Sequence, residues 1–435
     1  MPASQRGSVF RRAAARWLCV ALALGMAACS RPARPVPPAL TTECYVWQQS
    51  GGPAVEAAVA RARETMEGYY LHAAEVKFGP EAVPVTKRFA APWAAAAATG
   101  RRVGLVIRIP VAEGGLGSDA RQARAIAELV SELKAEGAKA GAHLETAEVQ
   151  IDYDCPDSKL ALFAVFLTAL RAQGVGPLVF TALPSWLNQP AFPKLARAAD
   201  SYVLQVHSLE LPRAGETEID LCDPEKARQA LRRAAEIGAP FRLALPTYRS
   251  VVLEDAGGKV FGVVSEGEAP EESPGIRRVP GRSRAPELAR LVGELRPAPP
   301  AGLRGIIWYR LPVEGDRMNW TWPTLQLVAA GHEPISRLAV RAVPDPKGFS
   351  TVQPVNTGET SEPLPSTLQV LWASDGRPAA ADALGAYREE NPPRDGHWRL
   401  VLKGVPLHEL APGQKVTAGW IRVGNPGSLT AEIIP

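Results

Sequence analysis

The stretch that decides the fold is Ala147-Glu-Val-Gln-Ile-Asp-Tyr-Asp154. It predicts a buried strand that ends in two acids, Asp152 and Asp154, whose side chains point the same way because they are two residues apart. Pro156 ends the strand, and Asp157 stands where a helix N-cap is expected. A strand that ends in acids and turns directly into a helix is typical of α/β enzymes, which present catalytic groups in this way.

Strand and helix patterns alternate from residue 44 to residue 332. Apolar stretches predict strands at 45–49, 69–78, 103–109, 148–154, 178–183, 202–207, 241–248 and 305–310. Helical patterns lie between them, at 53–67, 92–98, 119–136, 157–173, 192–199, 224–237, 285–295 and 323–330. This alternation predicts an α/β fold, a (β/α)8 TIM-type barrel over 44–332. A doubly wound open sheet is the alternative, but the expected Gly-rich phosphate turn after its first strand is reduced here to Gly51 and Gly52.

One connection inside the barrel, from residue 248 to residue 285, is longer than most loops. Gly257-Gly258 predicts a hairpin that overhangs the barrel mouth, and a solvated excursion is an equally good interpretation. After residue 333 the pattern changes to short alternating stretches between Pro and Gly turns, which predicts a small β-sandwich over 333–435. This second domain shows no catalytic cluster, and we interpret it as a structural or surface-docking module.

The pattern of residues 1–28 is typical of an export signal. Four arginines precede a short apolar run, 17–28, which fits a signal peptide over 1–28. Two alanines before Cys29 resemble a bacterial lipobox, which implies cleavage before Cys29 and its lipidation, and a soluble secreted protein is the alternative. Ser30 replaces the Asp that marks inner-membrane retention in lipoprotein families, so we expect an outer-membrane anchor. The Pro-rich residues 29–43 then form a tether.

Charge and cysteine content limit the partners. The formal charge of the chain is +4, and residues 1–28 hold four arginines and no acids, so the remainder has a charge of 0. Nothing therefore predicts nucleic-acid binding.

An exported compartment permits a disulfide between Cys155 and Cys222, which both follow predicted strands, with Cys44 left free. His72, His143 and His207 lack metal-ligand spacing and the chain has no Cys-x-x-Cys pair, so no metal and no cofactor are expected.

Six motifs together resemble a bacterial family known only as domain of unknown function 3142. They are Tyr45-Val-Trp-Gln, Gln150-Ile-Asp-Tyr-Asp-Cys, Thr181-Ala-Leu-Pro-Ser-Trp-Leu, Leu204-Gln-Val-His, Ala244-Leu-Pro-Thr-Tyr and Ile307-Trp-Tyr-Arg-Leu-Pro. The resemblance implies an exported barrel of glycoside-hydrolase-like type and brings no established activity. The strand at Asp152 is also similar to the Asp-x-Asp-x-Glu strand of chitinases. Two residues beyond Asp154 stands Pro156 in place of an acid, which speaks against a chitinase mechanism.

Catalytic residues of such barrels come from the C-terminal ends of the strands. The predicted catalytic residues are Asp154 as acid or nucleophile, Asp152 as the supporting carboxyl and Glu75 as a second carboxylate. The predicted substrate-binding residues are Trp47, Gln49, Arg108, Gln205, His207, Tyr248, Trp308 and Arg310.

Each of these assignments has a structural alternative. The aspartates could pair with Arg108 or Arg310, and Glu75 could pair with Lys77. His207 and the tryptophans could belong to the core.

These observations favour an envelope-anchored barrel that binds a glycan in its mouth, with hydrolysis at Asp154 as the enzymatic hypothesis. The alternative is a non-catalytic glycan-binding or envelope-scaffold lipoprotein on the same fold, because fold alone does not establish activity. The Pro at position 156 is the sequence feature that favours this alternative.

Overall fold

The structure is a computed structural model, and it describes residues 39–48, 51–79, 84–110, 116, 120–207, 211–213, 215–267, 273–373, 377–404, 409–424 and 429–434. The predicted signal peptide, Cys29 and Gln49 lie outside these residues, as does most of the tether.

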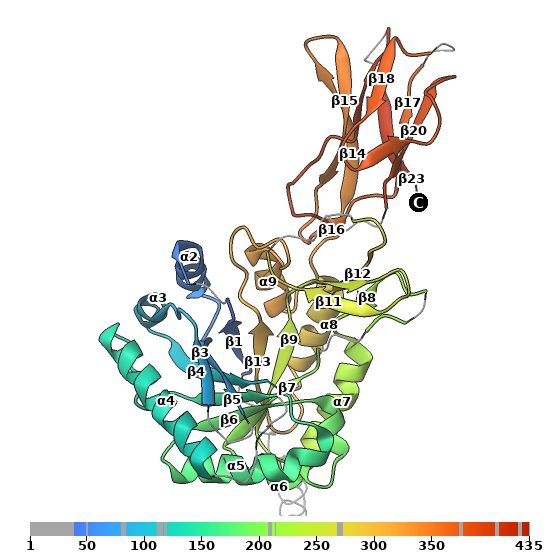
Figure 1. The fold of residues 1–435 in the computed structure, drawn as a ribbon. Helices are drawn as coiled ribbons and strands as arrows, with labels where there is room; N and C mark the ends of the chain where they lie inside the picture. Colours follow the sequence, from blue (N-terminus) through green and yellow to red (C-terminus); the bar gives the residue numbers. More distant parts are fainter. Residues whose placement is uncertain are drawn as a thin grey trace, which may run out of the picture. The chain divides into compact units, whose positions relative to one another are not determined.

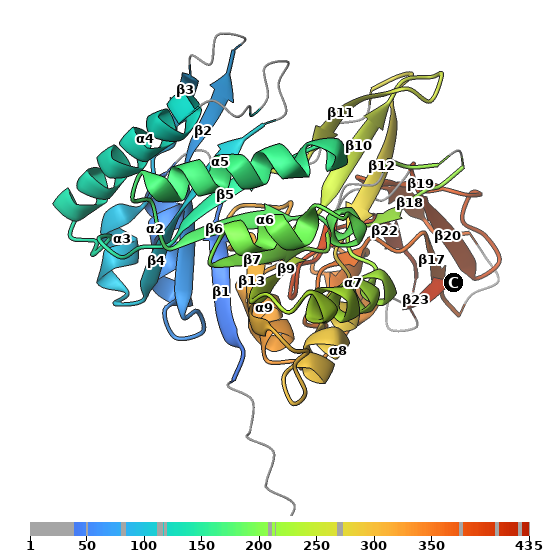
Figure 2. The ribbon, with the colours of Figure 1, turned by 90° about the horizontal axis from the view of Figure 1, so that it is seen from below.

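Eight parallel strands form a closed barrel (Figures 1 and 2). In chain order they are β1 (Thr41–Val46), β2 (Gly68–Phe78), β4 (Arg102–Ile109), β5 (Val149–Tyr153), β6 (Leu178–Ala182), β7 (Ser201–Gln205), β9 (Phe241–Pro246) and β13 (Leu303–Tyr309). Strand β1 pairs in parallel with both β2 and β13, which closes the sheet. The predicted (β/α)8 barrel is confirmed.

A helix follows each barrel strand before the next one begins, and the helices cover the outside of the barrel (Figure 2). They are α2 (Pro53–Ala62), α3 (Trp93–Ala98), α4 (Ala120–Lys139), α5 (Leu160–Ala172), α6 (Phe192–Ala198), α7 (Pro224–Ile237), α8 (Ala285–Leu295) and α9 (Trp322–Ala329). Helix α7 starts at Pro224 behind the capping side chain of Asp223 and stops at Gly238, which has a left-handed φ of 75°.

The expected N-cap at Asp157 is not formed. Asp157 begins the 3-10 turn η1 (Asp157–Lys159), and its carboxylate instead accepts a hydrogen bond from Gln189 Nε2 at 2.9 Å.

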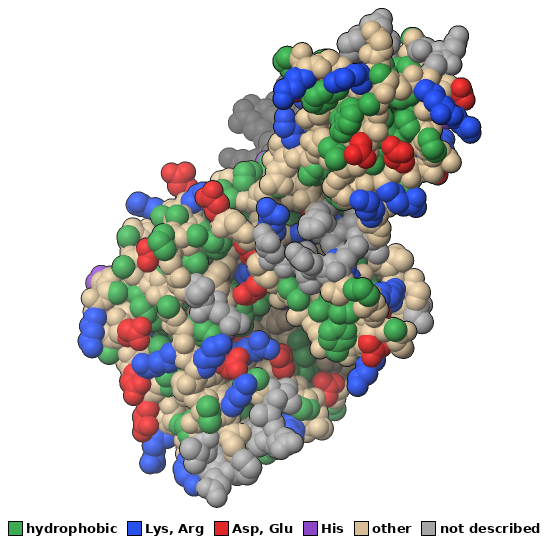
Figure 3. Space-filling model, turned by 45° about the horizontal axis from the view of Figure 1, so that its top comes forward, with side chains coloured by type: hydrophobic (Ala, Val, Ile, Leu, Met, Phe, Trp, Pro, Cys, Tyr) green, Lys and Arg blue, Asp and Glu red, His purple; other side chains and the backbone are tan. Residues whose placement is uncertain are grey.

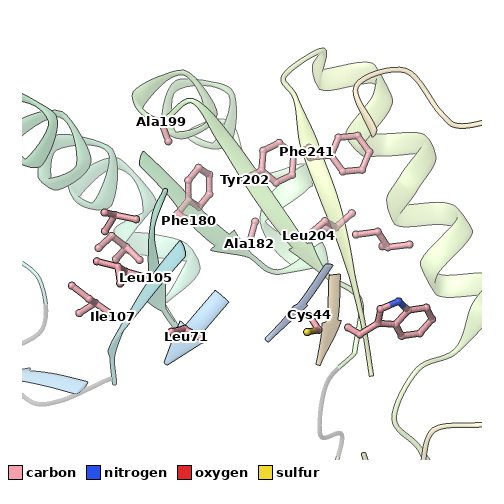
Figure 4. Packing of buried hydrophobic residues seen from close by; sticks show 14 of the residues in the cluster. Cys44, Leu71, Leu105, Ile107, Phe180, Ala182, Ala199, Tyr202, Leu204 and Phe241 are labelled. Atoms are coloured by element: carbon pink, nitrogen blue, oxygen red, sulfur yellow. The ribbon is translucent and has the colours of Figure 1, made fainter. Parts of the chain in front are cut away.

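The main core lies between the strands and the helices (Figure 4). Apolar residues on one side of each strand, such as Leu105 and Ile107 of β4, face this layer. Helix α4 supplies Ile126, Val130 and Leu133 at helical spacing, all buried. Burying a side chain of this size stabilises the fold by about 1.5–3 kcal/mol, so this layer holds the helices on the barrel.

The other side of each strand fills the barrel interior, and its lower layer is charged. Arg242 of β9 donates to Glu43 of β1 at 2.8 Å and also to Glu148 and the Tyr70 hydroxyl. Glu43 is 1% exposed and forms a second ion pair, with Arg102, whose Nη2 lies 2.5 Å from Oε1 of Glu43. Residues 41–43, assigned to the tether from the sequence, therefore belong to β1 and help to close the bottom of the barrel.

The long connection after β9 forms a small sheet with the order β11-β10-β12-β8. Strands β10 (Ser250–Glu254) and β11 (Val260–Val264) are the predicted hairpin, and β12 (Arg277–Arg282) and β8 (Ile219–Asp220) extend it. The Asp255 carboxylate accepts from the backbone N–H of Gly257 and Lys259, and Gly258 has a φ of 79°, which explains the turn. Strand β3 (Pro84–Arg88), which was not predicted, pairs antiparallel with the end of β2. All five of its residues are exposed, so they show no apolar–polar alternation of buried and exposed sides.

The C-terminal strands form the predicted β-sandwich from the sheets β14-β15-β22-β18 and β19-β20-β17-β23, with the short pair β16-β21. The bounds are β14 (Leu338–Asp345), β15 (Phe349–Asn356), β16 (Glu362–Pro363), β17 (Thr367–Leu371), β18 (Ala380–Ala383), β19 (Tyr387–Glu389), β20 (His397–Leu402), β21 (Glu409–Leu410), β22 (Gly419–Arg422) and β23 (Thr430–Ile434). Its core contains Trp398, Leu368 and Ile421.

Cys44, Cys155 and Cys222 are free and buried, so the disulfide considered from the sequence is wrong. Within the described residues, no helix is long and apolar enough to cross a membrane.

Candidate active site

A pocket of about 120 Å³ opens where the barrel strands end. Figure 3 shows this face of the molecule, which is hollowed, with basic and acidic side chains gathered beside the hollow. The pocket is lined by Tyr45, Trp47, Arg108, Asp152, Asp154, Thr181, Gln205, His207, Ala244, Tyr248 and Tyr309.

Strand β5 supplies the carboxylates because its polar residues all lie on one side. Glu148, Gln150 and Asp152 alternate with buried apolar residues, and Asp154 continues the same alternation one step past the strand. Gln150 is buried below the pocket, where it accepts a hydrogen bond from the Tyr45 hydroxyl at 2.7 Å and donates to Glu148 at 2.8 Å. Polar contacts therefore connect the pocket floor at Tyr45 with the charged layer at the bottom of the barrel.

Asp152 is the buried acid of the pocket, with 9% of its surface exposed. Burial and the neighbouring charge of Asp154 raise its pKa from 3.8 to about 6, although the Thr181 hydrogen bond and the charge of Arg108 lower it. The Thr181 hydroxyl donates to Oδ1 of Asp152 at 2.6 Å. Asp152 can therefore hold a proton at mildly acidic pH, as a general acid or a proton-sharing partner must.

Asp154 is the exposed acid, with 48% of its side chain accessible. Arg108 on β4 lies between the two acids. Its Nη2 is 3.5 Å from Oδ2 of Asp154, and its Nε is 3.9 Å from Oδ2 of Asp152. Both distances exceed the 2.7–2.9 Å typical of a strong charge-assisted bond, so the guanidinium holds neither carboxylate tightly.

Aromatic rings form the rest of the wall, and Tyr309 at the end of β13 is their centre. Its ring centroid lies 6.0 Å from Tyr45, 5.2 Å from Trp47, 5.2 Å from His207 and 5.4 Å from Tyr248. Aromatic surfaces of this kind bury the apolar faces of a ligand while the polar groups between them fix its orientation.

Two buried histidines support these rings. His207 is 3% exposed, and burial lowers its pKa to about 3, so the imidazole is neutral at physiological pH. Its Nδ1 is buried and has no hydrogen-bond partner among the described residues. His72 stacks on Trp47 with centroids 4.1 Å apart and contacts Phe89 on its other side, at 4.3 Å. The histidines therefore pack as rings and carry no charge into the pocket.

The pocket brings together most of the predicted site residues: Trp47, Arg108, Asp152, Asp154, Gln205, His207 and Tyr248. Glu75 and Arg310 do not line it. Glu75 lies on β2 with its carboxylate 3.4 Å from Lys77 Nζ. Arg310 is 1% exposed and donates to Asp316 and, at 2.8 Å, to the Ser265 carbonyl, so it holds loops together.

Trp308 also does not line the pocket. It points to the opposite side of β13 from Tyr309 and is fully buried in the core beneath the helices, near Trp320.

Tyr45, Thr181, Ala244 and Tyr309 line the pocket but were not predicted as site residues. Ile307-Trp308-Tyr309-Arg310 has no apolar–polar alternation within the strand, so its inward side could not be identified. One signal in the sequence could have found Tyr45: residues two positions apart on a strand share a side. Because Tyr45 and Trp47 lie on one side of β1, choosing Trp47 also selects Tyr45.

The position two residues beyond Asp154, where the chitinase-like pattern would place an acid, lies outside the pocket. Gln150, Asp152 and Asp154 share the inward side, whereas Pro156 precedes η1 and does not line the pocket.

Residues 99–314 match the model of the family described as domain of unknown function (DUF3142). The resemblance drawn from the sequence is confirmed for this segment. It runs from just before β4 to just after β13 and so includes both aspartates. A comparison with curated proteins found no match.

The chain, including the segment that matches DUF3142, is similar to several solved structures. A chitinase from Chromobacterium violaceum is 15% identical, with 67% of this chain and 98% of that chain covered, at a TM-score of 0.45. The spore cortex-lytic enzyme SleL of Bacillus cereus is 11% identical over 68% and 74% of the two chains, at 0.48. The chitinase ChiA74 of Bacillus thuringiensis is 9% identical over 89% and 98%, at 0.44. Because all these values are low, we derive the chemistry from the side chains of this chain.

Proposed function

We propose that the barrel is a glycoside hydrolase that binds a glycan in the pocket at the ends of its strands. The observation that carries the proposal is the pairing of Asp152 and Asp154 on one side of β5, inside a wall of Trp47 and tyrosines. Glycosidic bonds are hydrolysed by two carboxyl groups with different protonation states. Burial raises the pKa of Asp152 to about 6, so this carboxyl can hold a proton at mildly acidic pH.

In this mechanism Asp154 is the acid or nucleophile that reaches the glycosidic bond, because its side chain is accessible from the pocket. Asp152 lies deeper and supports it, and its raised pKa allows it to hold a proton at mildly acidic pH. Tyr309 and Trp47 contact the faces of the sugar ring, and Gln205 and Arg108 bond its hydroxyl groups.

A second function, glycan binding without hydrolysis, is favoured by one observation. Arg108 lies beside both carboxylates, so each of them already has a cation as a neighbour on the pocket side. In a binding protein the same three side chains would serve only to bond sugar hydroxyls.

A hydrolysis and binding screen of the purified full-length protein separates these functions. Product release that falls at least about 100-fold in Asp154→Asn, the lower end of what a general acid contributes, supports the hydrolase. Binding without product release, by both the native protein and Asp154→Asn, contradicts it and supports the second function. Asp157→Asn is the matched control, because Asp157 lies three residues on, at the start of η1, and does not line the pocket.

We also propose that the protein is exported and anchored to the outer membrane through a lipid on Cys29. The arginine-rich start, the apolar run 17–28 and the alanines before Cys29 support this. Mass spectrometry of the mature N-terminus tests it. A diacylglyceryl group on Cys29 in the native protein, with Cys29→Ala found outside the membrane fraction, is the expected result. A mature N-terminus without lipid would leave a soluble secreted protein.

A further inference from the structure

We propose that the sugar ring entering this pocket carries a free amine, so that the ligand is a glycan built from amino sugars whose nitrogen is not acylated. The inference rests on the proposed glycan binding and adds the chemical class of the ligand.

The charges that line the pocket are predominantly negative. Among the described lining residues, Asp152 and Asp154 face one cation, Arg108, and the others are uncharged. His207 adds no positive charge, because burial holds its pKa near 3. With both acids ionised the lining has a net charge of −1, which attracts a cationic ligand and repels a carboxylated sugar.

Arg108 does not neutralise Asp154 fully. The Nη2–Oδ2 distance is 3.5 Å, and nearly half of the Asp154 side chain is exposed. An ammonium group that reached 2.7–2.9 Å from a free Asp154 oxygen would form a stronger charge-assisted bond than Arg108 does. Asp154 is therefore placed to bind a ligand amine while Arg108 remains beside Asp152.

The aromatic wall suits the same group. Tyr45, Trp47, Tyr248 and Tyr309 surround the pocket opposite the acids, and aromatic faces attract a cation that has lost its water. His72 covers one face of Trp47, so it is the remainder of the indole that lines the pocket. Acids on one side and rings on the other form a common arrangement for binding an amine.

One more polar atom is available for a ligand. Nδ1 of His207 is buried and has no hydrogen-bond partner within the part of the chain that the structure describes, in a residue that lines the pocket and is 3% exposed. A buried polar atom without a hydrogen bond lowers the stability of the fold. A sugar hydroxyl or amine at this position would satisfy it, which is an observation independent of the acids that points to a polar ligand.

The test compares three oligosaccharides with one backbone. Calorimetry with the full-length protein would use β-1,4-linked glucosamine oligomers, their N-acetylated counterparts and glucose oligomers of equal length. We expect the amine form to bind about tenfold more tightly than the other two, the effect of one charge-assisted bond. We expect Asp154→Asn to lower the affinity for the amine form to that for the N-acetylated form. Asp157→Asn should keep the preference.

Three results would overturn the inference. The first is an affinity for the N-acetylated or glucose oligomers equal to or above that for the amine form. The second is a preference that survives in Asp154→Asn, which would place the amine elsewhere. Both leave the proposed glycan function standing. The third, no binding of any oligosaccharide in this set or in the wider screen, removes the proposed function as well.

Discussion

The hydroxyl of Thr181 on β6 donates a hydrogen bond to Oδ1 of Asp152 on β5, at 2.6 Å. This bond favours the charged form of an acid whose burial favours the neutral form. The two strands are neighbours in the barrel, so the β5–β6 pairing fixes the distance between the two side chains. The pKa of Asp152 on β5 therefore depends partly on the Thr181 hydroxyl of the neighbouring strand β6.

Thr181→Val should raise the pKa of Asp152 further above its value of about 6. The change removes the donor, and losing a hydrogen bond to a charged group raises an acid's pKa by roughly one unit. Carbon-13 NMR titration of labelled aspartate carboxyls measures the shift. Thr168→Val on α5 is the control, because its hydroxyl donates to the Ala164 carbonyl of the same helix. An unchanged or lowered pKa in Thr181→Val would contradict this role.

Asp152→Asn should stabilise the protein above pH 6 but not near pH 4. The pKa of Asp152 is raised from 3.8 to about 6 on folding, so the folded protein binds this proton more tightly than the unfolded chain. The stability of the native protein therefore falls as the pH rises from about 4 to 6 and then levels off. A difference of about two pKa units corresponds to roughly 2–3 kcal/mol at neutral pH.

Urea unfolding of Asp152→Asn at several pH values measures this difference in the free energy of unfolding. Asp157→Asn is the control, because its carboxyl is exposed. A gain for Asp152→Asn that stayed constant from pH 4 to pH 8 would show that ionisation of Asp152 is not the cause.

The barrel could be predicted from the sequence because its strands and helices differ in period. Runs such as Val103–Ile109 alternate with helical patterns such as Ile126, Val130 and Leu133, and the structure contains both where they were expected. Strand β5 also revealed its inward side, since Gln150 and Asp152 alternate with apolar residues.

The remaining site residues could not be predicted because both sides of most barrel strands are apolar. Trp308 and Tyr309 are both aromatic, and only the fold shows that one faces the helices and the other the pocket. The start of β1 was missed for a related reason. From the sequence, Glu43 is interpreted as a solvent-exposed residue of the tether. Its partner Arg242, whose Nη1 lies 2.8 Å from Oε2 of Glu43, is 199 positions away and cannot be found from local sequence.

Arg242→Met should destabilise the barrel by about 3 kcal/mol, the lower end of the cost of breaking a buried ion pair. The change leaves Glu43, 1% exposed, with Arg102 as its remaining cation. Chemical denaturation measures the loss. The surface pair Arg228–Glu294 is the control, and Arg228→Met should cost about 0–1 kcal/mol. The double variant Glu43→Gln/Arg242→Met should recover part of the loss, because it removes the uncompensated charge; no recovery would assign the loss to packing.

Trp308→Phe should lower the stability of the protein and Tyr309→Leu its glycan affinity, although the two residues are adjacent. Trp308 is fully buried beneath the helices, so Trp308→Phe leaves a cavity and should cost about 1–3 kcal/mol of stability, without changing the glycan affinity of the folded protein. Tyr309 lines the pocket, and Tyr309→Leu removes an aromatic contact worth about 0.5–1.5 kcal/mol, so the affinity should fall roughly two- to tenfold.

Denaturation and calorimetry on the same samples separate the two effects. A lower affinity in folded Trp308→Phe, or an unchanged affinity in Tyr309→Leu, would show that β13 presents its other side to the ligand. The side that faces the pocket is decided by the alternation of side chains along the strand, so a reversal would apply to Ile307 and Tyr309 together.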